Sequence, residues 1–506
     1  MPARTRGQAD QLISGLVEAL SPSARRRMSA APIYRRIADG IARRVAQLDL
    51  APGTRLPPER QLAVALRVSR ATVVAAYRDL EARGLVRGFV GRGTFVAAQS
   101  DGGTPFAWRG KIATAALATR DTTLRDLMQH ASTPGLISLA AGTPALDRFP
   151  SDAFRAAADA VVTDHAPLVW GHAPTEGHTV VREALARRFG GDASEVFVIG
   201  GAQQGLDLLA RCLIDRGDAV IVDRPGYLGA LQSFRSAGAR MFGWDILRAD
   251  PDELEDLLLR HRPKLLYTNP TFQNPTGVTV PIRVRREIVQ LAQRFRVPII
   301  EDETYRELSF GSGVPPSLYE LDEDREVVIR VCSFSKVLAP GLRLGWINAA
   351  RPIVEQLTLM KQQSEPHTNN LAQLTVARLI ESGAFDRHLG TLRTEHRRRR
   401  DSMVRALARY APPGALRLTA PAGGLFLWCR LAPHFSAAVV QQHALQRDVS
   451  IVTGSPFYAD GGGSRELRLC FAANDPEVGG RAARIVAESI AATADRGDTP
   501  AVSRLV

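Results

Sequence analysis

Lysine is scarce in this chain, and one lysine stands where an amine could do chemistry. Only four of the 65 basic residues are lysines: Lys111, Lys264, Lys336 and Lys361. Lys336 alone follows an apolar run, Val327–Val331, and it lies among hydroxyl side chains with an arginine seven positions further on. A desolvated amine is a nucleophile that forms Schiff bases with carbonyl compounds. The other three are interpreted as one linker residue and two solvated charges, so Lys336 is the candidate.

A carboxylate and a phenol follow a second apolar run. Val297–Ile300 leads into Glu-Asp-Glu-Thr-Tyr, which contains Asp302 and ends at Tyr305. A carboxylate at the carboxyl end of a parallel strand points into the crevice where α/β proteins bind ligands. Asp302 is therefore placed to hold a protonated ring nitrogen, and Tyr305 is placed to donate to a neighbouring oxygen anion.

Two further turns follow predicted strands. Leu265–Tyr267 runs into Asn-Pro-Thr-Phe-Gln-Asn-Pro-Thr-Gly, which presents Asn274, although this turn alone could equally be Pro/Gly punctuation. Val196–Ile199 runs into Gly-Gly-Ala-Gln-Gln at a helix start, where bare N–H groups suit a phosphate. An isolated glycine pair is a weak signal. Amine, acid, phenolate donor and phosphate cradle are together what pyridoxal 5′-phosphate (PLP) requires of a protein.

Residues 33–97 predict a separate module, a winged helix-turn-helix. Ile33–Leu48 repeats apolar residues at helical spacing, a second short helix follows Pro57-Pro58, and Ser69 can cap a third helix. Leu85–Arg87 and Thr94–Val96 flank a Gly-rich tip and predict a two-stranded hairpin.

The charge of this module indicates DNA as its partner. Residues 1–100 hold 17 arginines and 7 acidic residues, whereas the rest of the chain carries a balance of only +3 out of +13. The first turn of the third helix of such a module enters the major groove, and here it offers Ser69, Arg70 and Thr72. Arg60 on the second helix and Arg92 at the wing tip are placed for phosphate contacts.

The predicted organisation is multidomain. It comprises an N-terminal extension (1–32), the winged module (33–97), a linker (98–120) and an α/β domain with a mostly parallel or mixed sheet (121–497). Apolar runs and helical patterns alternate in the last part, without an internal repeat. The chain shows no metal-ligand spacing, no apolar run long enough to span a bilayer and no secretory h-region, so we expect a cytoplasmic protein without a metal.

Two resemblances strengthen these interpretations. The run Leu-Pro-Pro-Glu-Arg-Gln-Leu-Ala, then Val-Ser-Arg-Ala-Thr-Val and Gly-Arg-Gly-Thr-Phe-Val, all within 56–96, resembles the GntR family of bacterial regulators. The ordered phosphate loop, Asn-Pro-Thr-Gly turn, Asp-x-x-Tyr and Ser-x-Ser-Lys motifs resemble the fold-type I, class I aminotransferases over about 121–495. The whole chain resembles a MocR-type regulator, in which the two parts are fused.

The resemblances imply roles for individual residues. Lys336 would form the Schiff base, Asp302 would pair with the pyridine nitrogen, Asn274 and Tyr305 would donate to the phenolate, and Tyr227 would stack on the ring. The phosphate would be held by Gly201, Ala202, Gln203, Ser333, Ser335 and Arg343. Gly142 would line the pocket in which Arg468 grips a substrate carboxylate. DNA contacts would come from Arg60, Ser69, Arg70, Thr72 and the wing around Gly91 and Arg92.

The chain departs from the aminotransferase pattern at one position. Trp170-Gly171 stands where the family usually has Tyr-Gly, whose tyrosine reaches the partner subunit's phosphate, so that contact is in doubt. The basic run His396–Arg400 is interpreted as a solvated helix face rather than a second DNA patch.

These observations predict a PLP-dependent, homodimeric transcription regulator that binds operator DNA and responds to an amino compound or to PLP. Two alternatives stay open at this point. One is a working aminotransferase with an attached DNA-binding head, and the other is a DNA-binding protein whose body has lost its cofactor.

Overall fold

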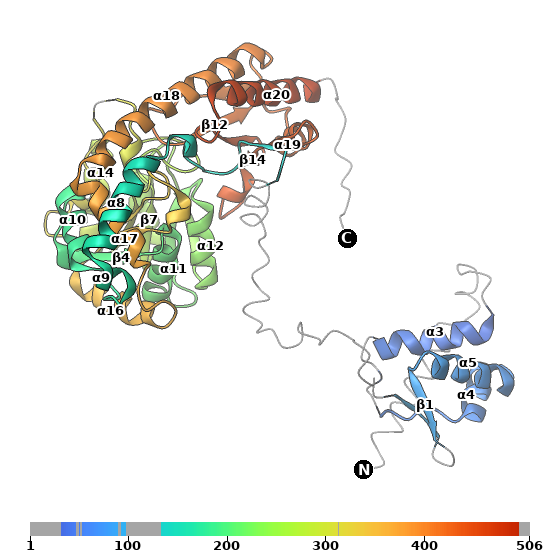
Figure 1. Cartoon of the computed structure of the whole chain (residues 1–506). Coiled ribbons are helices and arrows are strands. Elements are labelled where there is room, and N and C mark those ends of the chain that lie inside the picture. The colour runs from blue at the N-terminus through green and yellow to red at the C-terminus, as the bar shows by residue number, and fades with distance from the viewer. Residues whose placement is uncertain are drawn as a thin grey trace. The chain divides into compact units, whose positions relative to one another are not determined.

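The computed structural model describes residues 32–46, 50, 53–89, 93–97, 133–311 and 313–494. The chain divides into two compact units, Met1–Ala118 and Thr119–Val506 (Figure 1). The predicted linker 98–120, residues 1–31 and the C-terminal residues 497–506 lie outside the described residues.

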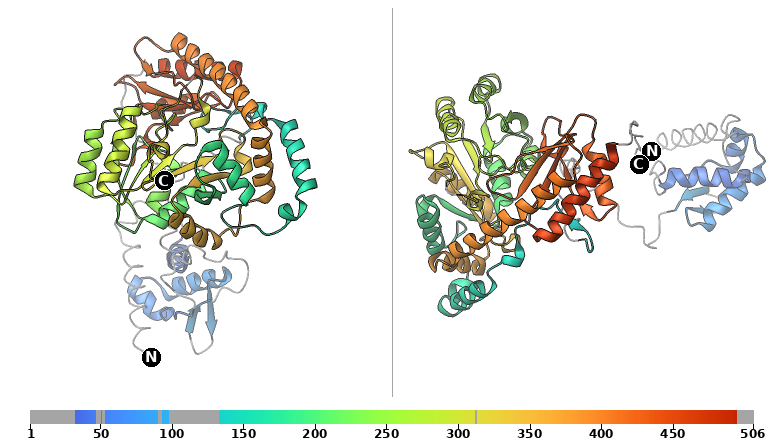
Figure 2. Two further views of the ribbon diagram at one scale, coloured as in Figure 1. Left: turned by 90° about the vertical axis from the view of Figure 1, so that its left-hand side faces the viewer. Right: turned by 90° about the horizontal axis from the view of Figure 1, so that it is seen from above.

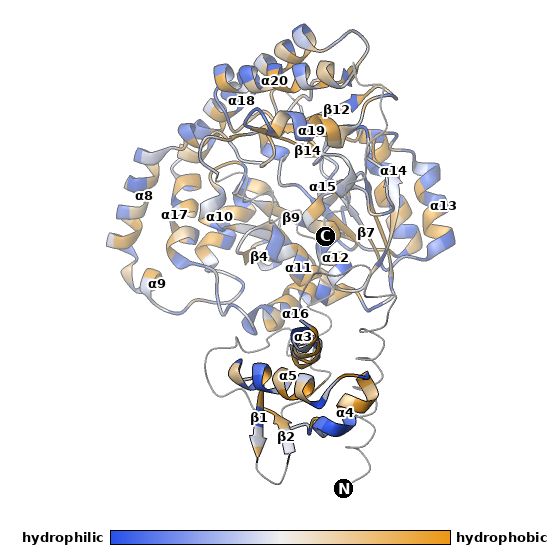
Figure 3. Cartoon of the chain, turned by 90° about the vertical axis from the view of Figure 1, so that its right-hand side faces the viewer, coloured by the Kyte–Doolittle hydropathy of each residue, from blue (hydrophilic) through white to orange (hydrophobic). Residues whose placement is uncertain are grey.

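The first unit is the expected winged helix-turn-helix. Its elements are α3 (Ile33–Ala46), α4 (Glu59–Leu66), α5 (Arg70–Ala82), β1 (Val86–Phe89) and β2 (Gly93–Val96). The two strands pair antiparallel, with Val86 opposite Val96. Ile37 and Ile41 of α3, Leu62 of α4 and Val73 and Leu80 of α5 are buried in one core. Figure 3 shows the mixed hydropathy of these helices, which is typical of helices with a single buried face.

The second unit is built on a mixed seven-stranded sheet in the order β4-β10-β9-β8-β7-β5-β6. The strands are β4 (Val196–Ile199), β5 (Ala219–Arg224), β6 (Arg240–Asp245), β7 (Leu265–Thr268), β8 (Ile299–Asp302), β9 (Val328–Ser333) and β10 (Gly345–Asn348). Strand β10 runs antiparallel to both β4 and β9, whereas the other neighbours pair parallel. The four apolar runs that the sequence predicts to be strands are confirmed as β4, β7, β8 and β9.

Helices bury both faces of this sheet, which explains why its strands are apolar runs rather than alternating ones. On β4, Phe197 and Ile199 pack with α11 (Ala202–Leu213), α12 (Leu228–Ser236) and α16 (Arg351–Gln362). Val196 and Val198 point to the other face and pack in the core that includes α8 (Ser151–Asp164), α10 (Thr179–Phe189) and α17 (Asn370–Glu381). Helices α13 (Pro251–His261) and α14 (Ile282–Phe295) cover the same face toward β7 and β8.

A smaller sheet completes the second unit. It has the order β11-β12-β15-β14 and is antiparallel. Its strands are β11 (Leu416–Leu418), β12 (Phe426–Leu431), β14 (Val452–Thr453) and β15 (Glu466–Cys470). Helices α18 (Ala384–Tyr410), α19 (Ala437–Leu445) and α20 (Pro476–Ala494) pack with it, and Figure 2 shows this orange-to-red part beside the green and yellow sheet. A short parallel pair joins β3 (Ile137–Ser138) to β13 (Val449–Ser450). None of the described helices is long and apolar enough to cross a membrane.

The basic run on α18 is only partly a solvated face: Arg397 and Arg398 are exposed, but the prediction is wrong for His396 and Arg399. Both side chains are buried. Arg399 donates to both carboxylate oxygens of Asp147 at 2.7 Å, to Glu395 at 2.8 Å and to the Ala472 carbonyl at 2.8 Å. His396 accepts from the Ala145 N–H through Nε2, and burial lowers its pKa to about 3. Hydrogen bonds from His396 and Arg399 therefore connect residues 145–147 to α18.

Replacing Arg399 tests this connection. Arg399→Ala leaves the buried Ala472 carbonyl without its donor and Glu395 with Arg398 alone, so we expect the free energy of unfolding of the second unit to fall by about 3 kcal/mol. Chemical denaturation followed by tryptophan fluorescence measures it. Arg397→Ala, which removes an exposed arginine from the same helix, should cost less than about 0.5 kcal/mol. Equal losses from both variants would contradict the buried role of Arg399.

Candidate functional site

Three parallel strands bring the predicted site residues to one edge of the large sheet. Strands β7, β8 and β9 are neighbours, and their carboxyl ends are Thr268, Asp302 and Ser333. The loops that carry Asn274, Tyr305 and Lys336 leave from these same ends. Because parallel strands share a carboxyl edge, residues far apart in sequence meet there.

Lys336 lies half-buried just beyond β9. Its Nζ donates to the Gly142 carbonyl at 2.7 Å. Burial lowers the pKa of Lys336 to about 8, with the charge of Arg468 acting in the same direction. A Cβ on Gly142 would lie 2.8 Å from the Phe426 ring and 3.7 Å from Lys336 Nζ, so only glycine fits against these two side chains.

Asp302 is a buried carboxylate whose orientation is set by its neighbours. One carboxylate oxygen accepts from the Thr304 N–H at 3.1 Å and from the Thr304 hydroxyl at 2.6 Å. The other accepts from the Tyr267 hydroxyl at 3.1 Å. Burial raises the pKa of Asp302, and the Thr304 and Tyr267 bonds oppose that shift. Each oxygen can accept a further hydrogen bond, so the carboxylate can still take a ring N–H.

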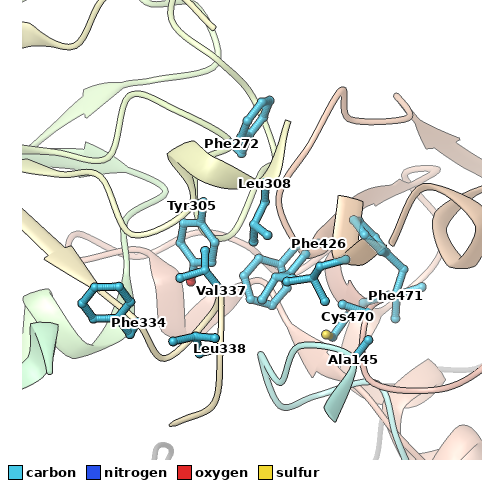
Figure 4. Close-up of a cluster of buried hydrophobic side chains, with 14 of the residues drawn as sticks. Ala145, Phe272, Tyr305, Leu308, Phe334, Val337, Leu338, Phe426, Cys470 and Phe471 are labelled. Carbon is cyan, nitrogen blue, oxygen red and sulfur yellow. The ribbon is translucent and has the colours of Figure 1, made fainter. Parts of the chain in front are cut away.

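Asn274, Tyr305 and Arg468 form one hydrogen-bonded group. Asn274 Nδ2 donates to the Tyr305 hydroxyl at 3.1 Å, and Arg468 Nη1 donates to Asn274 Oδ1 at 2.9 Å. Arg468 also donates to the Ala140 carbonyl and lies 4.4 Å from the centre of the Phe426 ring. Figure 4 shows Tyr305 and Phe426 approaching each other from the two sheets. Arg468 thus reaches across from β15 to the turn after β7.

Residues that were predicted to hold a phosphate lie at the start of α11. Gly201 is the residue before this helix, with φ of +100°, and Ala202 and Gln203 open it. A Cβ on Gly201 would lie 2.9 Å from the Arg343 guanidinium, so that cation stands directly beside the bare turn. Helix N-termini with bare N–H groups bind anions. On the β9 side, the Ser333 hydroxyl donates to the Ser335 hydroxyl at 3.0 Å.

The side chains of Gln203 and Tyr227 are already engaged. The Tyr227 hydroxyl donates to Gln203 Oε1 at 3.2 Å, while Gln203 Nε2 donates to the Gly229 carbonyl at 3.0 Å. A Cβ on Gly229 would lie 2.6 Å from Tyr227, so this glycine makes room for the ring. Gln203 therefore offers its backbone N–H rather than its amide to an anion.

The arrangement fits PLP. Glycines at positions 142 and 201 keep open the space that a Cβ would fill beside Lys336 and Arg343. The buried Arg468 Nε has no hydrogen-bond partner among the described residues, which leaves a donor for an anionic group. Amine, carboxylate, phenol and cradle all lie at one edge, which is the donor set that PLP chemistry uses.

Sequence reasoning missed three residues of the site and misjudged one lysine outside it. Tyr267 and Phe426 were hidden within apolar runs, and Asp223 lies on β5, with burial raising its pKa to about 7. Lys361 was interpreted as solvated, and this is wrong. It is fully buried, donates to the carbonyls of Thr175 and Val198 at 2.9 Å, and burial lowers its pKa to about 8. Its amine is occupied with main-chain carbonyls, away from Asp302.

The structure describes four of the six residues of the winged module that were predicted to contact DNA. The Ser69 hydroxyl caps α5 by accepting from the Thr72 N–H at 3.1 Å, as predicted. Arg70 is 58% exposed but pairs with Glu59 at 3.0 Å, so this carboxylate has to release it before it can grip a base. Arg60 is exposed on α4. Gly91 and Arg92 lie outside the described residues.

Trp170, the departure from the aminotransferase pattern, is 71% exposed at the end of α9 (Ala166–Trp170). Its ring is therefore on the surface of this chain rather than in its core. Leu168 on the same short helix is exposed as well.

Comparison with known proteins agrees with both parts of this description. Residues 134–486 match the family "Aminotransferase class I and II", and residues 33–96 match "Bacterial regulatory proteins, gntR family". The 2-aminoadipate transaminase of Thermus thermophilus is 36% identical over 74% of this chain and 94% of its own length. The HTH-type transcriptional regulator YdfD of Bacillus subtilis is 29% identical over 88% of this chain and 94% of its own.

The solved structures agree with the sequence comparisons. LysN, the α-aminoadipate aminotransferase of Thermus thermophilus in complex with N-(5′-phosphopyridoxyl)-L-leucine, superposes with a TM-score of 0.73 at 34% identity. The match covers 77% of this chain and 99% of that one.

Fold and site together define a fold-type I aminotransferase domain attached to a GntR-type DNA-binding module. The chain belongs to the MocR-type subfamily of GntR regulators.

The lowered pKa of Lys336 predicts how PLP capture depends on pH. Only the neutral amine reacts with an aldehyde, and a pKa of about 8 makes its fraction rise about tenfold from pH 6 to pH 7 and level off above pH 9. Stopped-flow absorbance at the cofactor band, with cofactor-free protein, measures the capture rate. A rate that still rises steeply between pH 9 and pH 10.5 would mean an ordinary, solvated lysine.

Proposed function

We propose that this protein is a transcription regulator whose aminotransferase-like domain holds PLP covalently on Lys336 and responds to an amino compound or to PLP itself. The observation that carries the proposal is the meeting of Lys336, Asp302, Tyr305 and Asn274 at one sheet edge, in a chain that also carries a DNA-reading module. Response to a ligand requires that it bind two states of the protein with different affinity.

Each site residue has a task in this proposal. When bound, PLP supplies an aldehyde that combines with amines and a ring that withdraws electrons. Lys336 would hold the cofactor, and Asp302 would keep a proton on its ring nitrogen. Asn274 and Tyr305 would donate to its phenolate oxygen, while the α11 N-terminus, Ser335 and Arg343 would bind its phosphate. Arg468, with its unpartnered Nε, would bind the carboxylate of an incoming amino acid.

An incoming amine that displaced Lys336 would change the charge in this pocket. Lys336 would then return to its hydrogen bond with the Gly142 carbonyl, which lies in the segment fastened to α18 by Asp147 and Arg399. Whether Lys336 is free or bound to the cofactor would therefore affect the packing of α18, through the segment that carries Gly142 and Asp147.

A second function, amino-group transfer from an amino acid to a 2-oxo acid, is favoured by one observation. The hydrogen-bonded group of Asn274, Tyr305 and Arg468 is intact, and amino-group transfer requires a carboxylate-binding arginine, as does a regulator that responds to an amino acid, whereas a regulator that responds to PLP alone does not. Steady turnover faster than about 0.1 s⁻¹ with an amino donor and a 2-oxo acid would favour this function, since enzymes typically turn over at 1 s⁻¹ or more.

The proposal also includes that the protein is a homodimer in the cytoplasm. Exposed Trp170 and Leu168 on α9 support an interface there, because neighbouring exposed apolar side chains mark contact surfaces. Two winged modules in one dimer would read two half-sites of double-stranded operator DNA.

The covalent lysine is tested by substitution and trapping. Lys336→Ala should abolish the absorbance near 420 nm after incubation with PLP, because no other amine meets the cofactor, while DNA binding persists. Borohydride reduction followed by peptide mass spectrometry should find the PLP adduct on Lys336 in the unmodified protein. Lys264→Ala, at an exposed lysine, is the control and should keep both signals. An adduct on another lysine would refute the assignment.

DNA binding by the winged module is tested by replacing two arginines that are expected to make different contacts, one to a base and one to a phosphate. Arg70→Ala should lose about 1–3 kcal/mol of preference for the operator over random DNA, since it removes a base contact. Arg60→Ala should weaken binding to all sequences alike and flatten the salt dependence, since it removes a phosphate contact. Fluorescence anisotropy at several salt concentrations separates the two effects, and the same sequence-blind loss from both variants would contradict the roles assigned here.

A further inference from the structure

A second cavity lies in the aminotransferase-like unit, on the other face of the large sheet from α11. Its volume is about 350 Å³. Arg330 and Cys332 of β9 line it, whereas Ile329 and Val331 alternate with them and pack on the α11 face. It shares Ser333 with the proposed cofactor site, but Lys336, Asp302 and Arg468 are absent from its lining.

Three ion pairs satisfy the charges of four residues in the cavity wall. Arg188 bonds Glu307 at 3.0 Å and Asp386 at 2.8 Å. Arg306 bonds Glu320 at 2.8 Å and donates its other guanidinium nitrogen to the Pro315 carbonyl. These four lining residues balance one another and leave no free charge for a ligand.

Glu303 is different, because half of its carboxylate has no partner. Its side chain is 1% exposed. Oε1 accepts from the Thr271 hydroxyl at 2.7 Å and lies 3.6 Å from Arg285. Oε2 is buried and has no hydrogen-bond partner among the residues that the structure describes. A buried carboxylate oxygen in this state favours a cationic donor.

Arg330 is the complementary case, a buried guanidinium without a carboxylate. It is 3% exposed. Nε and Nη2 donate to the Asn348 side chain, and Nη2 also donates to the carbonyls of Phe189 and Gly190. These partners are neutral, no carboxylate of the described residues lies within 4.0 Å, and Nη1 makes no hydrogen bond to them. Arg330 therefore retains a positive charge and a donor for an anion.

The strand register sets the distance between these two groups. Glu301 pairs with Arg330 across β8 and β9, so Glu303 lies two residues further along on the same side. With strands about 4.8 Å apart and a rise of about 3.3 Å per residue, the two Cα atoms are about 8 Å apart. Both side chains line the same cavity, which therefore offers a carboxylate oxygen and a guanidinium group to one small ligand that bears both charges.

We propose that this cavity binds a neutral aliphatic α-amino acid, with its ammonium group on Glu303 and its carboxylate on Arg330. The apolar side chain would lie against Phe189, Val337 and Trp346, which also line the cavity. This is a ligand site separate from Lys336, and it holds whether or not the proposed covalent cofactor is correct. Its wall, Glu303 and Ser333, directly adjoins the edge that carries Asp302.

Binding is tested with the full chain in the Lys336→Ala form, without PLP, so that the covalent site cannot contribute. Isothermal titration calorimetry with L-leucine should give saturable binding at one site. Two truncated probes, 3-methylbutylamine without the carboxylate and 4-methylpentanoate without the ammonium, should each bind at least about tenfold more weakly, since each loses a charge-assisted hydrogen bond. Equal affinity for either probe, or no binding of L-leucine, overturns the proposal.

A matched pair of variants locates the site. Glu303→Gln should weaken L-leucine binding at least about tenfold, because a neutral amide replaces the carboxylate whose Oε2 has no partner among the described residues. Glu307→Gln changes a carboxylate of the same cavity that is already paired with Arg188 and Arg393, so it should alter the affinity less than about threefold.

Arg468→Gln on the same background should leave L-leucine binding unchanged, since Arg468 belongs to the other site. Loss with Arg468→Gln but not with Glu303→Gln would place the ligand in the cofactor site and overturn the proposal. Circular dichroism checks that each variant is folded. If Glu303→Gln does not fold, the comparison of the three probes still decides.

Discussion

Charged groups at the carboxyl edge of the large sheet are largely removed from water and must find partners within the protein, and the arrangement of the candidate site depends on this requirement. Asp302 accepts hydrogen bonds from Tyr267 and Thr304. Lys336 donates to the Gly142 carbonyl, and Arg468 donates to the side chain of Asn274 and the carbonyl of Ala140. An ion left alone in such a place costs several kcal/mol. The neighbours of these groups are therefore as necessary as the groups themselves.

This requirement also explains why the site draws on both sheets. Arg468 and Phe426 belong to the small sheet, Lys336 and Asp302 lie at the end of the large one, and Gly142 lies in a segment between β3 and η2 (Leu146–Arg148). The segment is fastened to α18 by buried Arg399 and His396. A change in what Lys336 binds would reach both sheets through Gly142, which gives the proposed regulator a route from ligand to helix packing.

Much of this could be predicted from sequence, because the signals were local. Apolar runs ended by Asp, Asn or Lys motifs located β7, β8, β9 and the residues beyond them, and Ser69 was found as a cap. The rest depends on tertiary packing. Lys361 and Arg399 are polar residues on helices, and nothing local distinguishes their buried faces from solvated ones. The pairing of Arg70 with Glu59 joins two helices and was not visible either.

The cavity behind β8 and β9 illustrates the same limit. Glu303 and Arg330 are 27 positions apart, and only the parallel register of their strands places them on one side of the sheet. A sequence pattern shows two ordinary charges, whereas the structure shows that Glu303 has one carboxylate oxygen without a partner and that Arg330 bonds only neutral groups among the described residues.

The central claim is that the ligand state of the body and DNA binding by the head are coupled. Coupling is reciprocal, so it can be measured from either side. The most direct measurement is the PLP affinity of the full chain with and without saturating DNA from the region upstream of its own gene. The account predicts that this DNA changes the PLP affinity at least about fivefold, a coupling of about 1 kcal/mol. The same affinity in both conditions would contradict it.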